Sequence, residues 1–255
     1  MYAEERRQAM ADLIAQRGRL SVNELAEAYA VTTETVRRDL SMLERAGIIR
    51  RVHGGAVPAK ALTVLETAVG ERDLAQADQK DRIAKAALGL LPAPGGTVVL
   101  DAGTTTSRVA TLLPQDLALT VFTNSVPIAA CLAGVSNIDL HLLPGRVRRT
   151  TQAAVGEDTV AALDVLRADV VFLGTNGIDP ELGLTTPDHS EAAAKRAMVH
   201  SGRSVVVLAD SSKVRREHTV RFAELREVDV LVTDDGIDEV AIKAFEDLGV
   251  EVVVA

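Results

Sequence analysis

Residues 31–57 read VTTETVRRDLSMLERAGIIRRVHGGAV, and this stretch decides the fold of the first part of the chain. Its apolar residues recur at the spacing of an α-helix: Val36, Leu40 and Leu43. At 100° per residue these side chains lie within about 60° of one another, so they predict one packed face. Thr32 or Thr33 provides an N-cap hydroxyl, and we expect a helix from there to about residue 46.

Shorter elements surround this helix. Ser21 and Glu24 have the spacing of a capping box, which predicts a second helix that starts at residue 22. Apolar residues at helical spacing, Ala9 and Leu13 among them, predict a helix upstream. The run IIRRVHGGAV at 48–57 is typical of a small β-hairpin with its Gly-Gly at the turn or exit. Three helices followed by such a hairpin, or wing, predict a winged helix-turn-helix.

The charge of this region differs from that of the rest. The whole chain carries a formal net charge of -8, whereas residues 1–57 hold 9 Lys and Arg against 8 Asp and Glu. Residues 37–51 contain five arginines and two acids, a local net charge of +3. A recognition helix in the major groove of DNA, with the wing on the adjacent phosphates, needs this arrangement. An ordinary solvated helix and a protein-binding winged helix remain the alternatives.

Length and composition indicate two domains. With 255 residues, 47 % of them apolar, the chain can bury a substantial core. The pattern of apolar residues changes near residue 58, so we expect a DNA-binding domain at 1–57 and an α/β domain at 80–255. Residues 58–79 show weak periodicity and are interpreted as a linker, or as an adaptor segment against the second domain.

Cysteine and histidine usage narrows the function classes. A single cysteine, Cys131, cannot form an intramolecular disulfide, and the charged first 20 residues do not resemble a signal peptide, so we expect a reducing cytoplasm. Cys131 is expected to pack as a small hydrophobe. No apolar run approaches the roughly 20 residues that span a bilayer, and no membrane role is expected. The five histidines are dispersed, so neither a metal site nor a cofactor is expected.

From about residue 80 onward, helical patterns alternate with short β-branched runs. The predicted helices are 80–91, 105–113, 126–133, 156–166, 190–200 and 239–248. The predicted strands are 97–100, 119–123, 138–143, 169–173, 204–209, 228–233 and 250–254. This rhythm predicts a mostly parallel sheet with helices on both faces, which binds ligands beyond the carboxyl ends of its strands.

The sequence DAGTTTS at 101–107 follows the first of these strands. Loop amides, threonine hydroxyls and the N-terminus of the next helix can converge there on an anion, and phosphate is the obvious candidate. A threonine-rich N-cap without a ligand is the alternative. Similar polar loops follow two other strands, TNS at 123–125 and GTNG at 174–177, and together they favour a binding site.

Three further polar groups stand out in the sequence, and two of them are expected near the same edge. Asp210 and Lys213 follow an apolar strand and suit a sugar hydroxyl and a phosphate. Glu191 and Lys195 stand four residues apart in a predicted helix, where they are also compatible with a plain surface salt bridge. A loop with Arg146, Arg148, Arg149 and Gln152 either joins the site or lies at the surface.

The N-terminal residues resemble a known signature. VTTETVRRDL at 31–40, followed by LERAGIIRRVHGGAV at 43–57, closely resembles the DeoR/GlpR family of bacterial sugar-metabolism regulators. Members of that family usually carry Ser where Thr32 stands, which retains the capping hydroxyl. The resemblance implies a recognition helix with Thr33, Thr35, Arg37 and Arg38, and a wing with Arg51 and His53.

The resemblance extends over nearly the whole chain. DAGTTTSRVA, TNS, TTQAAVG, GTNGID, EAAAKRAM and ADSSK are similar to the sensor domain of that family, which has a fold like that of ribose-5-phosphate isomerase. The resemblance implies a phosphosugar bound by Asp101, Gly103, Thr104, Thr105, Thr106, Asn124, Lys195, Asp210 and Lys213. MYAEERRQAM and RRVHGGAVPAKALTVLE look most like regulators of fructose phosphotransferase operons.

These observations predict a repressor that binds operator DNA and is released by a sugar phosphate such as fructose 1-phosphate, through linkage between two sites. The rival reading is a sugar-phosphate isomerase with a DNA-binding appendage, because Asp, Glu and Lys at a phosphosugar site suit proton transfer. Helix-turn-helix regulators commonly match a palindromic or repeated DNA site, so we expect a homodimer or tetramer.

Overall fold

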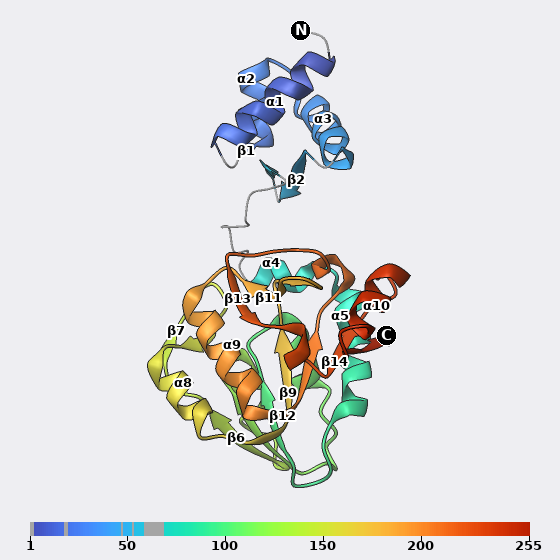
Figure 1. Ribbon diagram of the computed structural model, residues 1–255. Coiled ribbons are helices and arrows are strands. Elements are labelled where there is room, and N and C mark those ends of the chain that lie inside the picture. Colours follow the sequence, from blue (N-terminus) through green and yellow to red (C-terminus); the bar gives the residue numbers. More distant parts are fainter. Residues whose placement is uncertain (1–2, 18–19, 47, 53, 59–68) are drawn as a thin grey trace. The chain divides into compact units, whose positions relative to one another are not determined.

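The computed structural model divides the chain into two compact units, residues 1–62 and 63–255 (Figure 1). It describes the residues 3–17, 20–46, 48–52, 54–58 and 69–255. Each unit has hydrophobic clusters of its own. No helix among the described residues is long and apolar enough to cross a membrane.

In its described residues, the first unit is a small α/β module with three helices and a three-stranded antiparallel sheet. Its helices are α1 (Ala3–Arg17), α2 (Val22–Tyr29) and α3 (Thr33–Arg45). Its strands are β1 (Leu20–Ser21), β2 (Ile49–Val52) and β3 (Gly55–Pro58), in the order β1-β3-β2. The predicted winged helix-turn-helix is confirmed, with β2 and β3 as the wing.

Local hydrogen bonds start the helices of this unit where the sequence predicts. The Ser21 hydroxyl accepts from the Glu24 amide at 3.1 Å, and the Glu24 carboxylate accepts from the Ser21 amide at 2.7 Å, which completes the capping box. Thr32, rather than Thr33, caps α3 by accepting from the Thr35 amide at 3.2 Å. The caps fix where α2 and α3 begin, and the buried side chains of Leu25, Val36, Leu40 and Leu43 then pack on one another.

The wing requires a glycine at its root. Gly55 pairs with Ser21, and a Cβ atom on Gly55 would lie 2.2 Å from the carbonyl oxygen of Leu20. Only a residue without a side chain lets β1 and β3 approach this closely. Gly54 turns the hairpin with φ of +74°, a left-handed conformation that also favours glycine.

The second unit is built on a seven-stranded sheet with the order β15-β14-β12-β9-β4-β5-β6. All six neighbouring pairs are parallel, as predicted. The strands are β4 (Thr97–Leu100), β5 (Leu119–Thr123), β6 (Ile138–Leu142), β9 (Ala168–Gly174), β12 (Gly202–Leu208), β14 (Val230–Thr233) and β15 (Glu251–Val254). The chain runs outward from β4 through β5 to β6 and then returns to place β9 on the other side of β4.

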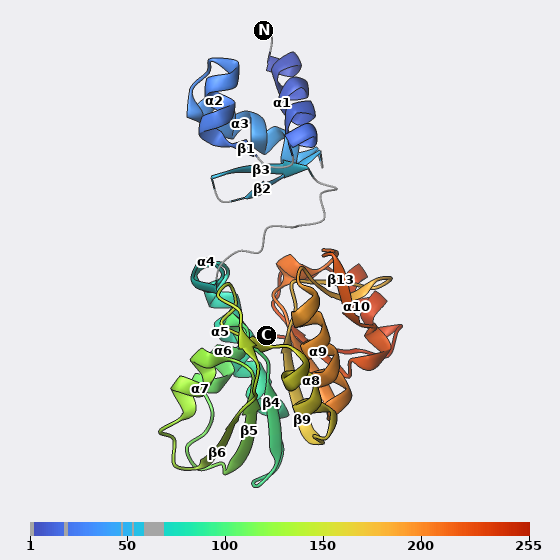
Figure 2. The same ribbon diagram turned by 90° about the vertical axis from the view of Figure 1, so that its left-hand side faces the viewer.

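Helices cover both faces of this sheet (Figure 2). One layer contains α5 (Ala77–Ala87), α6 (Thr104–Thr111) and α7 (Val126–Leu132), and the other contains α8 (Glu157–Asp164), α9 (His189–Ser201) and α10 (Glu239–Glu246). Alternate residues of one strand face opposite layers. Val98 and Leu100 of β4 belong to the hydrophobic cluster with α5, α6 and α7, whereas Val99 belongs to the cluster with α8, α9 and α10. Both faces are therefore apolar, as parallel sheets require.

Several short elements were not predicted. They are α4 (Val69–Leu74), the two-stranded sheet β7 (Arg146–Val147) and β8 (Ala154–Val155), and the antiparallel sheet β10 (Gly177–Asp179), β11 (Gly183–Thr186) and β13 (Val220–Ala223). Three 3₁₀ turns complete the described part of the chain: Leu88–Leu90, Ser211–Lys213 and Leu225–Glu227. The segment 58–79 thus contains α4 and the first residues of α5.

The expectation for Cys131 was wrong. Its side chain is exposed near the end of α7, rather than packed as a small hydrophobe. Helix α7 buries Ile128, Ala129 and Leu132, and Cys131 is not among its buried positions.

Candidate functional site

A pocket of about 340 Å³ opens at the carboxyl ends of three adjacent strands, β4, β9 and β12. Strand order reverses between β4 and β9, because the chain continues from β4 in one direction and from β9 in the other. Open parallel sheets bind ligands at such a switch point. The volume lies within the range of roughly 300–1,000 Å³ that is usual for small-molecule sites.

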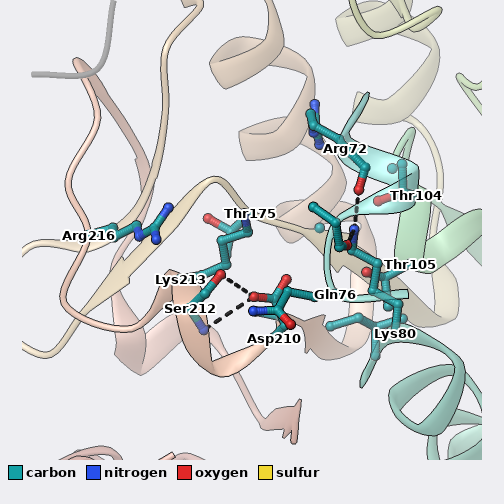
Figure 3. A pocket seen from close by; sticks show the side chains of 15 residues that line it. Arg72, Gln76, Lys80, Thr104, Thr105, Thr175, Asp210, Ser212, Lys213 and Arg216 are labelled. Atoms are coloured by element: carbon teal, nitrogen blue, oxygen red, sulfur yellow. Dashed lines mark hydrogen bonds between the residues drawn. The ribbon is translucent and has the colours of Figure 1, made fainter. Parts of the chain in front are cut away.

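Ten polar or charged side chains among the described residues line this pocket (Figure 3). They come from the first turn of α6, from the residue after β9, from the 3₁₀ turn after β12 and the residues around it, and from α4, α5 and the residue between them. The labelled residues are Arg72, Gln76, Lys80, Thr104, Thr105, Thr175, Asp210, Ser212, Lys213 and Arg216.

The charge of the pocket is opposite to that of the chain. Four cations line it, Arg72, Lys80, Lys213 and Arg216, against the single carboxylate of Asp210. Asp210 is buried and caps the following turn by accepting from the Ser212 amide at 3.2 Å and from the Ser212 hydroxyl. A net charge of +3 on the lining, in a chain with a net charge of -8, favours an anionic ligand.

Lys80 is the most buried of the four cations. Only 5 % of the residue is exposed, and its ammonium donates to the backbone oxygens of Arg72 and, at 2.5 Å, of Ala75. Burial lowers the pKa of Lys80 to about 8, an effect that the nearby Asp210 carboxylate opposes. A bound anion would favour the charged form of this lysine.

The N-terminus of α6 faces the same pocket. Gly103 is its N-cap and provides no side-chain hydrogen bond, so the first-turn amides of Thr104 and Thr105 have no cap from this residue. The hydroxyl of Thr106 donates back to the carbonyl oxygen of Asp101 at 2.7 Å and to that of Gly103 at 3.0 Å. Thr106 therefore shapes the loop, while Gly103, Thr104 and Thr105 line the pocket.

Asp101 and Lys195 form a buried ion pair beside the pocket. The Lys195 ammonium donates to Asp101 Oδ2 and, at 2.9 Å, to the carbonyl oxygen of Gly174, and it lies 5.5 Å from the ring centroid of Phe222. The Gly174 amide donates to the same carboxylate at 3.0 Å. Burial raises the pKa of Asp101, and the charge of Lys195 opposes this shift. Neither residue is among those that line the pocket.

Asn124 joins two loops at the sheet edge. Its side-chain oxygen accepts from the Ala102 amide at 2.9 Å, and its side-chain nitrogen donates to the carbonyl oxygen of Ala154 at 3.1 Å. These bonds hold the loop after β4 against β8. Of the nine residues that the resemblance implied, five line the pocket. The other four are buried next to it and do not line it: Asp101, Thr106, Asn124 and Lys195.

The pair Glu191 and Lys195 is not a surface salt bridge. Both residues are buried, and they bind different partners, because Glu191 accepts from Arg148 and from the Thr151 hydroxyl. Arg148 also lies 3.3 Å from Asp188 Oδ2, whereas Arg146 and Arg149 are exposed. The polar loop at 146–152 therefore anchors α9 through one arginine and leaves the other two at the surface.

Sequence reasoning missed more than half of the labelled pocket residues: Arg72, Gln76, Lys80, Thr175, Ser212 and Arg216 were not named as candidates. Arg72 and Gln76 fall in the segment without clear periodicity. Arg216 had a usable signal, because the run KVRR at 213–216 follows the loop of a predicted strand. Thr175 and Ser212 lie inside the motifs GTNG and ADSSK, which were singled out without naming these two residues.

The predicted DNA-binding residues of α3 lie in its first two turns. Arg37 and Arg38 are exposed, and Arg37 lies 3.6 Å from Glu34. The acidic Asp39 of this helix is buried and binds Arg6 of α1 at 2.7 Å, so it does not offset the exposed arginines. Thr33 and Thr35 are half-buried beside the N-cap. Arg51 lies on β2, and His53 falls outside the described residues.

Comparison with known proteins identifies both units. Residues 6–61 match a family model of the DeoR-like helix-turn-helix domain, and residues 75–235 match a model of the DeoR C terminal sensor domain. The chain is 38 % identical to the HTH-type transcriptional regulator GlpR of Haloferax volcanii, over 99 % of this chain and 98 % of the relative.

Two further relatives are also named as regulators. The uncharacterized HTH-type transcriptional regulator FruR of Bacillus subtilis is 35 % identical, and the glycerol-3-phosphate regulon repressor of Escherichia coli is 32 % identical, each over 92 % of both chains. Among solved structures, ribose 5-phosphate isomerase A of Methanocaldococcus jannaschii is similar over 55 % of each chain, with 18 % identity and a TM-score of 0.41.

Proposed function

Since this chain belongs to the DeoR family of transcriptional regulators, we propose that it represses a carbohydrate uptake or catabolism operon, that of fructose, and that a sugar phosphate releases it from operator DNA. The observation that carries the proposal is the cationic pocket at the switch point of the sheet. A winged helix with exposed arginines in the same chain supplies the DNA-binding half.

The pocket suits the two ends of a phosphorylated sugar. A phosphate carries a charge of about -1.5 to -2 at pH 7 and three strong acceptor oxygens, which match the cations Arg72, Lys80, Lys213 and Arg216 and the first-turn amides of α6. The Asp210 carboxylate and the Gln76 amide suit sugar hydroxyls. The relative named as a glycerol-3-phosphate regulon repressor supports a phosphorylated ligand, and fructose 1-phosphate is the effector that we propose.

The DNA side of the proposal rests on α3 and the wing. We propose that Thr33, Thr35, Arg37 and Arg38 contact DNA in the major groove, with Arg51 and His53 on the adjacent backbone. Arginine side chains at the start of a recognition helix suit both guanine edges and phosphates. The burial of Asp39 against Arg6 leaves this part of α3 more basic than its sequence count suggests.

The relatives are named as regulators, and the geometry gives the isomerase alternative little support. Isomerisation needs a base that reaches the substrate carbon. Asp101 is 1 % exposed, is bound by Lys195 and Gly174, and does not line the pocket. Asp210 does line it, but this buried carboxylate already accepts hydrogen bonds from the Ser212 amide and hydroxyl. Incubation of the full chain with pentose and hexose phosphates tests this directly, since any protein-dependent interconversion would contradict a purely sensory site.

We also propose a cytoplasmic homodimer or tetramer, because two recognition helices match a palindromic or repeated operator. Sedimentation equilibrium at micromolar concentration measures the mass. A mass of one chain with and without operator DNA would contradict the oligomer while leaving the sensor site unaffected.

Calorimetric titration of the full chain with fructose 1-phosphate tests the effector site. The matched variants are Arg216→Ala, which removes a pocket cation, and Arg203→Ala, which removes an arginine 78 % exposed outside the pocket. Loss of a charge-assisted hydrogen bond worth about 1.5–3 kcal/mol predicts a roughly 10- to 150-fold weaker Kd for Arg216→Ala and no change for Arg203→Ala. Equal affinity in all three proteins would refute this placement of the ligand.

A further inference from the structure

Helix α4 is the first element of the second unit in chain order, and it forms part of the pocket wall. Arg72 of α4 lines the pocket together with Ala75 and Gln76, which follow the helix. Figure 3 shows Arg72 and Lys80 on the same side of the cavity, joined by a hydrogen bond from the ammonium to the Arg72 carbonyl. The first helix that the structure describes after the wing therefore contributes to the pocket lining.

Two cations hold α4 in place. Lys80 of α5 donates to the carbonyl oxygens of Arg72 and Ala75 at the end of the helix. Arg108 of α6 donates to the Asp73 carboxylate and, at 3.2 Å, to the Asp73 carbonyl. A helix of six residues is too short to be stable alone, so its position depends on such tertiary bonds.

Both cations are also connected to the pocket. The side chain of Lys80 belongs to the lining, and Arg108 donates to the carbonyl oxygen of Thr104, another lining residue, at 3.0 Å. Arg108 further binds Asp81 of α5 at 2.6 Å. An anion that contacts Lys80 or the first turn of α6 therefore acts on the same groups that fix α4.

The Lys80 ammonium is the group for which a bound anion and α4 compete. An ammonium has three N–H donors, and two of them are used on the carbonyl oxygens of Arg72 and Ala75. A phosphate oxygen is a stronger acceptor than a neutral carbonyl, because hydrogen bonds between ionised groups are roughly twice as strong as neutral ones. The same anion attracts the Arg72 guanidinium on α4.

We propose that α4 transmits effector binding to the DNA-binding unit: an anion bound by Lys80 and Arg72 redistributes the bonds that hold α4, and thereby changes the position of this helix. The inference rests on the proposed function, since it takes the pocket as the effector site. It assigns Arg72 and Lys80 to effector recognition, and it assigns Asp73 and Arg108 to positioning α4. Allosteric coupling of this kind typically changes affinity about 5- to 150-fold.

Two variants of the full chain separate coupling from binding. Asp73→Asn weakens the Arg108 bond to α4, whereas the matched control Asp81→Asn weakens the Arg108 bond to α5. Asp73 and Asp81 are similarly exposed, at 50 % and 55 %, and neither lines the pocket. Each protein is titrated with fructose 1-phosphate, and its Kd for DNA from upstream of the neighbouring genes is measured with and without that ligand.

We expect the wild-type chain and Asp81→Asn to lose about tenfold or more in DNA affinity when fructose 1-phosphate is added. Asp73→Asn should bind the ligand within about threefold of wild type and yet show a DNA response reduced at least about fivefold. By reciprocity, DNA should also affect ligand affinity less in this variant. Amide hydrogen exchange over 69–76 of the wild-type chain should change on addition of fructose 1-phosphate, a readout that needs no variant.

The possible failures are distinguishable. If fructose 1-phosphate does not bind the wild-type chain, the proposed effector and this inference both fall. If it binds and releases DNA equally from all three proteins, or if Asp81→Asn loses the response as much as Asp73→Asn does, only the role of α4 is overturned. Unchanged exchange over 69–76 in a ligand-bound, DNA-releasing chain would also overturn it.

Discussion

The substitution Lys195→Met tests whether the Asp101–Lys195 pair is a structural element beneath the pocket. It removes the ammonium that binds Asp101 and the Gly174 carbonyl, and it leaves the buried carboxylate with the Gly174 amide as a remaining donor. Removal of one partner of a buried ion pair typically costs about 3–5 kcal/mol. At roughly 2–4 °C per kcal/mol for a unit of this size, we expect the midpoint of thermal unfolding to fall by about 6–20 °C.

The titration of Asp101 predicts how the loss of stability in Lys195→Met changes with pH. Burial raises the folded-state pKa of Asp101 above its usual 3.8, and Lys195 opposes that shift. Between the unfolded and folded pKa values the folded chain binds more protons, so stability falls as pH rises through this window. Without Lys195 the folded pKa rises further, and the window extends upward. The deficit of Lys195→Met should therefore be smaller at pH 5.5 than at pH 8.

Calorimetric unfolding of the full chain at both pH values provides the assay, with the double variant Asp101→Asn/Lys195→Met as control. The double variant carries no buried charge at this position and should recover part of the lost stability at pH 8. A deficit for Lys195→Met below about 1 kcal/mol at pH 8, with no pH dependence, would refute the structural role, because that is the range of an exposed pair.

Three shorter predictions concern the two sites and one cap. Affinity for fructose 1-phosphate should fall as pH rises above about 8, because burial lowers the pKa of Lys80 to about 8 while the phosphate remains dianionic; a flat calorimetric profile from pH 7 to 9.5 would exclude Lys80 from the anion site. Arg38→Ala should weaken DNA binding and reduce the salt dependence of log Kd by about 0.9 if a phosphate contact is lost; anisotropy titrations at several salt concentrations measure this, and an unchanged affinity would remove Arg38 from the interface. Thr32→Ala should destabilise the first unit by about 1 kcal/mol, because the Thr35 amide loses its cap; urea unfolding followed by circular dichroism would contradict this if the midpoint did not move.

The N-terminal unit was predictable because its signals are local. A capping box, an N-cap threonine and apolar residues at helical spacing each act within one or two turns, and they fix α2 and α3 almost to the residue. The location of the pocket was predictable for a topological reason, since the carboxyl ends of parallel strands meet at one edge. Gly103, Thr104, Thr105, Asp210 and Lys213 line it accordingly.

The remaining features depend on contacts between distant segments. Asp101 and Lys195 stand 94 residues apart, and nothing local in either motif shows that they bind each other rather than a ligand. Arg72 lies on a six-residue helix with little apolar periodicity, so the pocket wall it forms was taken for a linker or adaptor. The short strands β10, β11 and β13 likewise form through long-range pairing.

The account is tested most directly by fluorescence anisotropy of the full chain on DNA from upstream of the neighbouring genes, at one fixed salt concentration because phosphate contacts make affinity salt-dependent. Titrations are made alone, with fructose 1-phosphate and with free fructose. The account predicts tight binding that fructose 1-phosphate weakens about tenfold or more and that free fructose leaves unchanged. DNA binding that is the same in all three titrations would contradict the claim that the cationic pocket senses this sugar phosphate.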